Sequence, residues 1–123
     1  MSTVHRFEDL NAWKKAREIT RMIYSITSDS DFARDFGLKD QIRRSSVSVM
    51  ANIAEGFARR TDRDFLHFLN ISRSSAAEVQ SHLYIALDQG YVDESEFDTL
   101  YEDLEQVSRM LFGLIRHLRK EKN

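Results

Sequence analysis

The stretch FDTLYEDLEQVSRMLFGLIRHL, residues 97–118, carries the clearest pattern in the chain. Its apolar residues recur at alternating steps of three and four: Phe97, Leu100, Leu104, Val107, Leu111, Leu114 and Leu118. This spacing places one apolar stripe along an α-helix and is typical of the a/d seam of a coiled coil or an antiparallel bundle. The stretch therefore predicts a long final helix, with Asp93 as its N-cap.

Turn residues are scarce in the rest of the chain. The 123 residues contain no proline and only four glycines. Because these two residues mark most turns, their scarcity predicts few and long elements. No window of five or more residues alternates apolar and polar side chains as a half-buried strand does. The sequence therefore predicts an all-α protein.

Helical spacing predicts three more helices before the last one. The first extends from about Glu8 to Ser28, and the second extends from about Leu38 to Ala58, after a loop with the sequence SDSDFARDFG. The third begins at an N-cap, either Thr61 or Asp62, and closes at Gly90. Short connections between the last three helices require them to lie antiparallel. The predicted fold is an antiparallel up-down-up-down four-helix bundle, one domain over residues 1–123.

Composition limits the classes of function. The absence of cysteine excludes disulfides and thiolate metal sites. No stretch approaches the roughly 20 apolar residues that a membrane span needs, and the first residues lack the apolar run of a signal peptide. We therefore expect a cytoplasmic protein with no membrane partner.

Arginines concentrate near the junction of the second and third helices. Arg59 and Arg60 fall at the end of one helix and Arg63 at the start of the next, so all three are expected at one corner. With Arg43, they form a candidate RNA or DNA interface, because guanidinium groups match phosphate oxygens. The net charge of −2 is unlike the strongly basic balance of many nucleic-acid-binding domains, so a protein partner stays the alternative.

A polar ridge is expected beside the apolar stripe of the second helix. Small and polar residues recur there every four positions, and the third helix offers a matching run, SRSSAAE. We interpret the ridge as a close helix crossing with a satisfied polar network rather than a catalytic pocket. Gly56 either ends the second helix or lies inside it at a close contact, and we favour the contact. The predicted network contains Arg44, Ser48, Asn52, Glu55, Ser75 and Glu78.

Enzymatic signatures are weak. A di-iron bundle needs two Glu-x-x-His pairs, and the sequence contains none, so no metal or cofactor is expected. One alternative is a small metal-independent ribonuclease, in which Arg60 would stabilise phosphate charge and His67, further along the chain, would transfer protons. We expect a non-enzymatic protein.

Three blocks of the sequence resemble one known family. They are FEDLNAWKKAREIT (7–20), LKDQIRRSSVSVMANIAEGFARRTDRDFLHFLNISRSSAAEV (38–79) and ALDQGYV (86–92), and the most specific piece is NIAEGFAR (52–59). They resemble the four-helix-bundle proteins encoded in intervening sequences of bacterial large-subunit ribosomal RNA genes. The motif residues that the resemblance implies are Arg44, Ser48, Asn52, Glu55, Gly56 and Phe57, with Ser75 and Glu78 opposite.

The resemblance also carries expectations about assembly and partners. It implies an antiparallel four-helix bundle that assembles in rings of five, and it does not imply an enzyme. A related accessory protein of diversity-generating retroelements is a pentamer that binds a reverse transcriptase and nucleic acid. Independently, apolar residues outside the main stripes suit a second, intersubunit face and predict a homo-oligomer: Met22, Tyr24, Tyr101, Met110 and Ile115.

Overall fold

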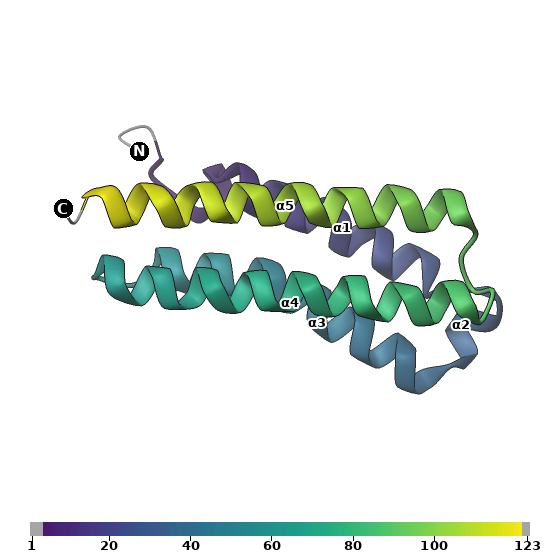
Figure 1. The fold of residues 1–123 in the computed structure, drawn as a ribbon. Coiled ribbons are helices and arrows are strands. Elements are labelled where there is room, and N and C mark those ends of the chain that lie inside the picture. Colours follow the sequence, from purple (N-terminus) through teal and green to yellow (C-terminus); the bar gives the residue numbers. More distant parts are fainter. Residues whose placement is uncertain (1–3, 122–123) are drawn as a thin grey trace.

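The computed structural model describes residues 4–121, all of them in helices or the loops between helices (Figure 1). There are five α-helices, four of them long, and no strand in this range. The prediction of an all-helical chain is confirmed, and residues 1–3 and 122–123 of the predicted domain lie outside the described residues. The elements are η1 (Phe7–Asp9), α1 (Asn11–Ile26), α2 (Ser30–Arg34), α3 (Phe36–Phe57), α4 (Asp62–Asp88) and α5 (Glu94–Glu121).

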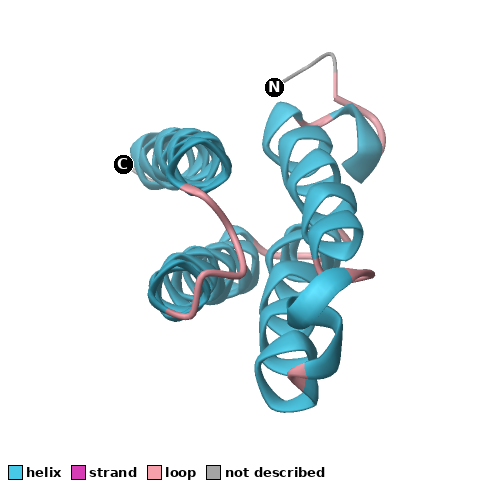
Figure 2. Cartoon of the chain, turned by 90° about the vertical axis from the view of Figure 1, so that its right-hand side faces the viewer, coloured by secondary structure: helices cyan, strands magenta, loops and turns pink. Residues whose placement is uncertain are grey.

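The four long helices lie around a common apolar core. Consecutive long helices run in opposite directions along the chain (Figure 1). Both α3 and α5 pack against α1 and against α4. In the view along α4 and α5, the other two helices pass at a tilt (Figure 2). No helix within residues 4–121 is both long and apolar enough to cross a membrane.

Two helix starts differ from the sequence prediction. Residues 7–9 form a 3-10 turn and the buried Leu10 is extended, so α1 begins at Asn11 rather than near Glu8. The segment predicted as a loop contains the short helix α2, because Phe32 is buried there and anchors one helical turn. Asp35 then accepts a hydrogen bond from the Leu38 backbone N–H at 3.1 Å, which caps α3 two residues earlier than expected.

The first helix ends at Ile26, two residues before the predicted Ser28, whereas the predicted ends of α4 and the start of α5 are confirmed. Thr61 Oγ1 accepts from the Asp64 N–H at 3.1 Å and caps α4. Gly90 follows the end of α4 with a φ of 73°, a conformation that favours glycine. Asp93 and Glu96 exchange side-chain to backbone hydrogen bonds of 2.7 and 3.0 Å, which is a reciprocal capping box at the start of α5.

A side-chain contact joins the two loops at the end of the fold opposite the chain termini. Tyr91 donates a hydrogen bond of 2.9 Å to Asp35 Oδ2, and its ring stacks on Phe32 with centroids 5.0 Å apart. The bond to the carboxylate raises the pKa of Tyr91 above its ordinary value of 10.0, because ionisation would break it. Asp35 thus both caps α3 and holds the α4–α5 loop in place.

The apolar stripe of α5 follows the predicted spacing except near its end. Ile115, not Leu114, occupies the buried position after Leu111, whereas Leu114 packs at the margin of the core. A strict seven-residue repeat drifts by about 20° per repeat around a straight helix. The step from Leu111 to the next buried residue is therefore four positions, to Ile115, instead of three, to Leu114. The prediction of Leu114 as a core residue is therefore wrong by one position.

The residues predicted to form a second apolar face mostly belong to the protein's own core. Met22, Tyr101 and Met110 pack half-buried against it, and Ile115 is fully buried. Only Tyr24 is exposed, at 41%. Of the five residues, only Tyr24 is largely exposed in one chain, so we argue self-association from other exposed side chains.

Gly56 is the last residue but one of α3 and packs directly against α4. It is buried, and a Cβ atom placed on it would lie 2.8 Å from Phe68 Cβ and 2.9 Å from Phe65 Cδ1. Cβ atoms in proteins essentially never lie within 3.0 Å of a neighbouring side chain, so only glycine fits here without a shift of the two helices. The preferred interpretation, a close contact within the helix, is confirmed.

Replacing Gly56 by alanine tests this contact. Helix propensity alone would stabilise α3 by about 1 kcal/mol, but the added methyl group must push against Phe68. We expect G56A to lower the free energy of unfolding by about 1–3 kcal/mol in urea denaturation. The matched control is Gly113→Ala in α5, where a Cβ meets nothing within 4 Å; it should raise stability by up to about 1 kcal/mol. Equal stabilisation by both changes would contradict the contact.

Candidate nucleic-acid interface

The loop between α3 and α4 brings three predicted arginines together. Arg59, Arg60 and Arg63 are all exposed at this corner. Backbone bonds from Ala58 to Ala54 and from Arg59 to Gly56 close α3, and the Thr61 cap opens α4 immediately afterwards. Both sides of the loop are therefore held by helix ends, so the backbone that carries the arginines is well defined. We refer to Arg59, Arg60 and Arg63 as the arginine corner.

The three arginines differ in what they contact. Arg59 Nη2 donates to Glu55 Oε1 at 2.9 Å, and its guanidinium carbon lies 4.7 Å from the centroid of the Phe68 ring. Arg60 and Arg63 are exposed and have no carboxylate within 4.0 Å among the described residues. Two of the three guanidinium groups thus stay available to an anion from outside.

A hollow of about 330 Å³ lies beside the arginine corner. Phe57 and Phe65 line it from α3 and α4, and their rings meet edge to face at 6.0 Å. Arg59, Asp62 and His117 supply its polar groups, so the C-terminal part of α5 reaches the same end of the fold. The exposed cations at the end of α5 add positive charge there: Arg116, Arg119 and Lys120.

Arg43 does not join the arginine corner. It lies on α3, 16 positions before Arg59, which corresponds to about 24 Å along a helix. Its Nε donates to Thr27 Oγ1 at 2.8 Å, and its guanidinium covers the Tyr24 ring at 4.3 Å. The structure therefore places Arg43 at the C-terminus of α1, where it also bonds a terminal carbonyl oxygen, that of Tyr24, at 3.3 Å.

The centre of the predicted polar network is present between α3 and α4. Ser48 Oγ and Ser75 Oγ are 2.8 Å apart, and Asn52 Nδ2 donates to Ser48 Oγ at 2.9 Å and to the Ser48 carbonyl at 2.8 Å. Ser72, which is fully buried, donates to the Val49 carbonyl at 2.7 Å across the same contact. This cluster crosslinks the two helices through short polar side chains.

The charged residues of the predicted network lie outside this cluster. Arg44 pairs with Asp40 at 2.9 Å on the surface, with 80% of its side chain exposed. Glu55 pairs with Arg59 of the arginine corner, whereas the exposed Glu78 and Arg44 line one hollow together with Ser48 and Ser75. The side chains are longer than the crossing admits, so they extend to solvent while serine and asparagine fill the contact.

The proposed ribonuclease pair is not assembled in the structure. Arg60 and His67 are both exposed, and no hydrogen bond joins them within the described residues. The His67 ring instead lies edge to face with Phe68, with centroids 5.3 Å apart. Over residues 4–121, no three His, Asp or Glu side chains group in a way that could hold a metal ion.

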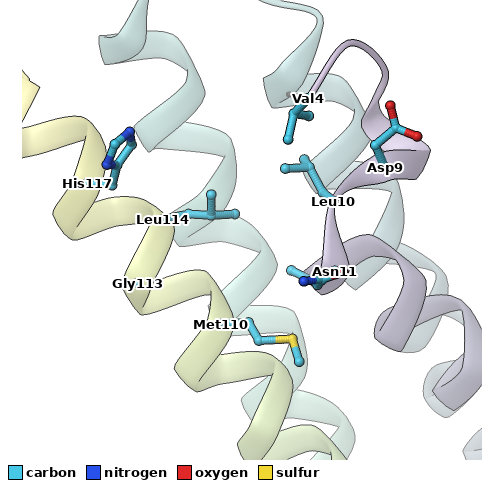
Figure 3. A pocket seen from close by; sticks show the side chains of 9 residues that line it. Val4, Asp9, Leu10, Asn11, Met110, Gly113, Leu114 and His117 are labelled. Carbon is cyan, nitrogen blue, oxygen red and sulfur yellow. The ribbon is translucent and has the colours of Figure 1, made fainter. Parts of the chain in front are cut away.

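A further hollow of about 360 Å³ opens between the start of α1 and the end of α5 (Figure 3). Leu10, Met110 and Leu114 make its lining mainly apolar. Asp9 and His117 lie on opposite walls, on separate elements, and Asp9 points away from the hollow (Figure 3). The lining is suited to contact with an apolar group, and it does not bring Asp9 and His117 together as an acid and a base.

One cluster was not predicted from the sequence. Arg73 of α4 and Arg116 of α5 both approach the exposed ring of Phe112, at 5.2 and 5.9 Å from its centroid. The spacing of Phe112 and Arg116, one helical turn apart, is visible in the sequence. Arg73 lies 39 positions before Phe112 in the sequence. Only the packing of α4 on α5 shows that Arg73 belongs to this cluster.

Two alanine variants separate the hydrogen-bonded cluster at the α3–α4 contact from the exposed charges. Asn52→Ala removes the donor to Ser48 at the α3–α4 contact, so the free energy of unfolding should fall by about 1–3 kcal/mol. Glu55→Ala removes a surface ion pair whose carboxylate side chain is 55% exposed, and it should change stability by less than about 1 kcal/mol. Urea denaturation of both variants measures the difference. Equal destabilisation would show that Asn52 is no more structural than Glu55.

Comparison with known proteins assigns the chain to a family. Residues 8–113 match the sequence profile of the 23S rRNA-intervening sequence protein family. A crystal structure of a protein of unknown function, from the S23 ribosomal protein family of Bacteroides thetaiotaomicron, is similar in fold, with a TM-score of 0.77 and 24% identity. The similarity covers 85% of this chain and 97% of that one. No curated protein matches the sequence. As the three sequence blocks predicted, the chain belongs to the 23S rRNA-intervening sequence protein family.

Proposed function

We propose that this protein is a non-enzymatic, homo-oligomeric accessory factor that binds the phosphate backbone of RNA or DNA. In this proposal the folded unit is an antiparallel up-down-up-down four-helix bundle, and the arginine corner is its contact surface. The observation that carries the proposal is the pair Arg60 and Arg63, which are exposed and have no acidic partner among the described residues. The runner-up is an accessory factor that binds a protein through the same corner.

Electrostatics favour an anionic partner at this end of the fold. A guanidinium group offers several fixed donors to phosphate oxygens and stays charged at every physiological pH. The N-terminus of α4 also points its positive dipole end at the corner, but Asp62 and Asp64 in its first turn offset that charge. The arginines therefore have to supply most of the attraction, and binding should be strongly salt-dependent.

Self-association would make such a weak surface effective. One corner offers few phosphate contacts, whereas several copies in one assembly bind the same strand repeatedly and raise the effective concentration. The apolar side chains left exposed on the outer faces of α3 and α4 support association, because large apolar groups gain from removal from water. They are Val47, Tyr84 and Ile85.

The assembly state is directly measurable. We expect light scattering at micromolar concentration to give a mass several times that of the 14.4 kDa chain, and five times that mass is the specific expectation. The exposed apolar groups supply the driving force for association. Native mass spectrometry then fixes the number of copies. A 14.4 kDa particle at these concentrations would refute self-association.

The arginine corner is tested by titrating labelled single-stranded RNA at low and moderate salt. The wild type should bind with an affinity that falls steeply with salt, because phosphate neutralisation releases counterions. Replacing Arg59, Arg60 and Arg63 by alanine should weaken binding and lower the salt slope by roughly 2, since each phosphate neutralised on a single strand accounts for about 0.7 of that slope. The control removes equal charge elsewhere, with Arg17, Arg21 and Arg34 changed to alanine.

Three other outcomes distinguish the alternatives. Undetectable or salt-independent binding by the wild type would remove the nucleic-acid proposal and leave a protein partner. Cleavage of the RNA without added metal would favour the ribonuclease, and His67→Ala should then abolish cleavage while leaving binding intact. Equal weakening by the control triple variant would show that net charge, rather than the arginine corner, determines affinity.

A further inference from the structure

The hollow around Phe112 has the features of a second binding site. It measures about 530 Å³ and lies along α5 beside Arg73 of α4, next to the hollow of Figure 3, with which it shares Gly113. Arg73, Arg109 and Arg116 line it together with Phe112 and Gly113. Small-molecule sites commonly occupy about 300–1,000 Å³, so this hollow has room for one nucleotide.

Two of its guanidinium groups are free of carboxylates. Arg109 is paired with Glu102 at 3.2 Å, but Arg73 and Arg116 form no ion pair within the described residues. Glu105 is the one carboxylate on the lining, and in the described part of the chain it pairs with neither of them. The two free cations come from different helices and converge on one ring, so they can hold an anion between them without a change of backbone.

The aromatic ring is itself available. Phe112 keeps 43% of its surface exposed with both guanidinium groups in place. By contrast, Tyr84 on α4 is 50% exposed but its ring contacts Phe97 and Tyr101, with no arginine over it among the described residues. An exposed ring flanked by arginines is the arrangement that stacks unpaired bases in single-strand-binding proteins.

Gly113 supplies a second, independent observation. It lies within α5, where glycine costs up to about 1 kcal/mol relative to alanine. A Cβ atom on Gly113 would meet nothing within 4 Å, so no contact inside the described chain requires a glycine. The absence of a side chain at Gly113 leaves the surface beside Phe112 open to a molecule that approaches from outside.

We propose that the hollow binds one unpaired nucleotide of a single strand, with the base against Phe112 and the phosphate between Arg73 and Arg116. The inference rests on the proposed nucleic-acid function and adds a second site on the same molecule. RNA and DNA share the chemistry that the site recognises, a flat base joined to a phosphate. A base in a duplex is stacked on both sides and does not reach the ring.

The test compares labelled 12-nucleotide oligouridylate, oligothymidylate and a blunt RNA duplex by fluorescence anisotropy. Phe112→Leu keeps an apolar side chain but removes the π face, so it should weaken binding of both single strands by about 5- to 100-fold. Duplex binding should change by less than about twofold, because it uses backbone contacts alone. Phe112→Trp should retain single-strand binding.

Matched controls separate this site from general effects. Phe36→Leu removes the most exposed phenylalanine, at 76%, which has no arginine contact among the described residues, and it should leave affinity unchanged. Arg73→Gln with Arg116→Gln should weaken single-strand binding more than Arg21→Gln with Arg34→Gln, which removes the same charge elsewhere. Circular dichroism and light scattering confirm that each variant is folded and assembled as the wild type is.

Each outcome bears on one of the two proposals. Wild-type binding of single strands with no effect of Phe112→Leu would overturn the nucleotide site and leave the arginine corner standing. No binding of any oligonucleotide by the wild type would overturn both. A lower assembly mass for Phe112→Leu, with single-strand and duplex binding reduced equally, would assign the ring to a contact between copies and overturn the nucleotide site.

Discussion

The close crossing of α3 and α4 is the contact on which the rest of the fold depends, and it is the most extensive between any two helices. Gly56 allows Phe65 and Phe68 to approach the α3 backbone, and small side chains continue the contact along both helices. Small residues bring with them buried hydroxyl groups, which destabilise a core unless they are hydrogen-bonded. Here Ser72 bonds the Val49 carbonyl and Ser75 bonds Ser48, and no buried side-chain polar atom of the described residues lacks a partner.

The α3–α4 crossing also determines where the positively charged side chains of the arginine corner lie. A short loop joins α3 to α4, so Arg59 and Arg60 on the loop and Arg63 in the first turn of α4 lie at one corner of the fold. The end of α5 reaches the same side of the fold, whereas the acidic start of α5 lies at the far end (Figure 1). Acidic residues at the beginning of α5 and basic residues at its end each stabilise the helix dipole. The same arrangement that stabilises α5 thus adds cations beside the arginine corner.

Sequence periodicity was sufficient for the helices, because burial repeats at the helical period wherever one face meets the core. It failed where a single residue determines the local structure or the position that is buried. The segment expected to be a loop contains α2, because Phe32 is buried there. Ile115 rather than Leu114 takes the buried position in α5, because a seven-residue repeat does not stay in phase with a straight helix. Residues on neighbouring turns of one helix, such as Ser48 and Asn52, were grouped correctly. Groupings across a longer distance along one helix were not: Glu55 pairs with Arg59 at the arginine corner, and Arg43 lies at the end of α1.

The two candidate surfaces differ in the physical basis of their specificity. The arginine corner offers charge without a fixed shape, so it would recognise any phosphate backbone and lose affinity with salt. The Phe112 hollow combines charge with an aromatic face, and stacking persists when salt screens the charges. Arg63 and the residues of the Phe112 hollow lie on helices that pack on the common core, and Arg59 and Arg60 lie on the short loop between α3 and α4. If copies assemble, each contributes both surfaces, and the affinity of the whole then depends more on how many copies contact one strand than on any single contact.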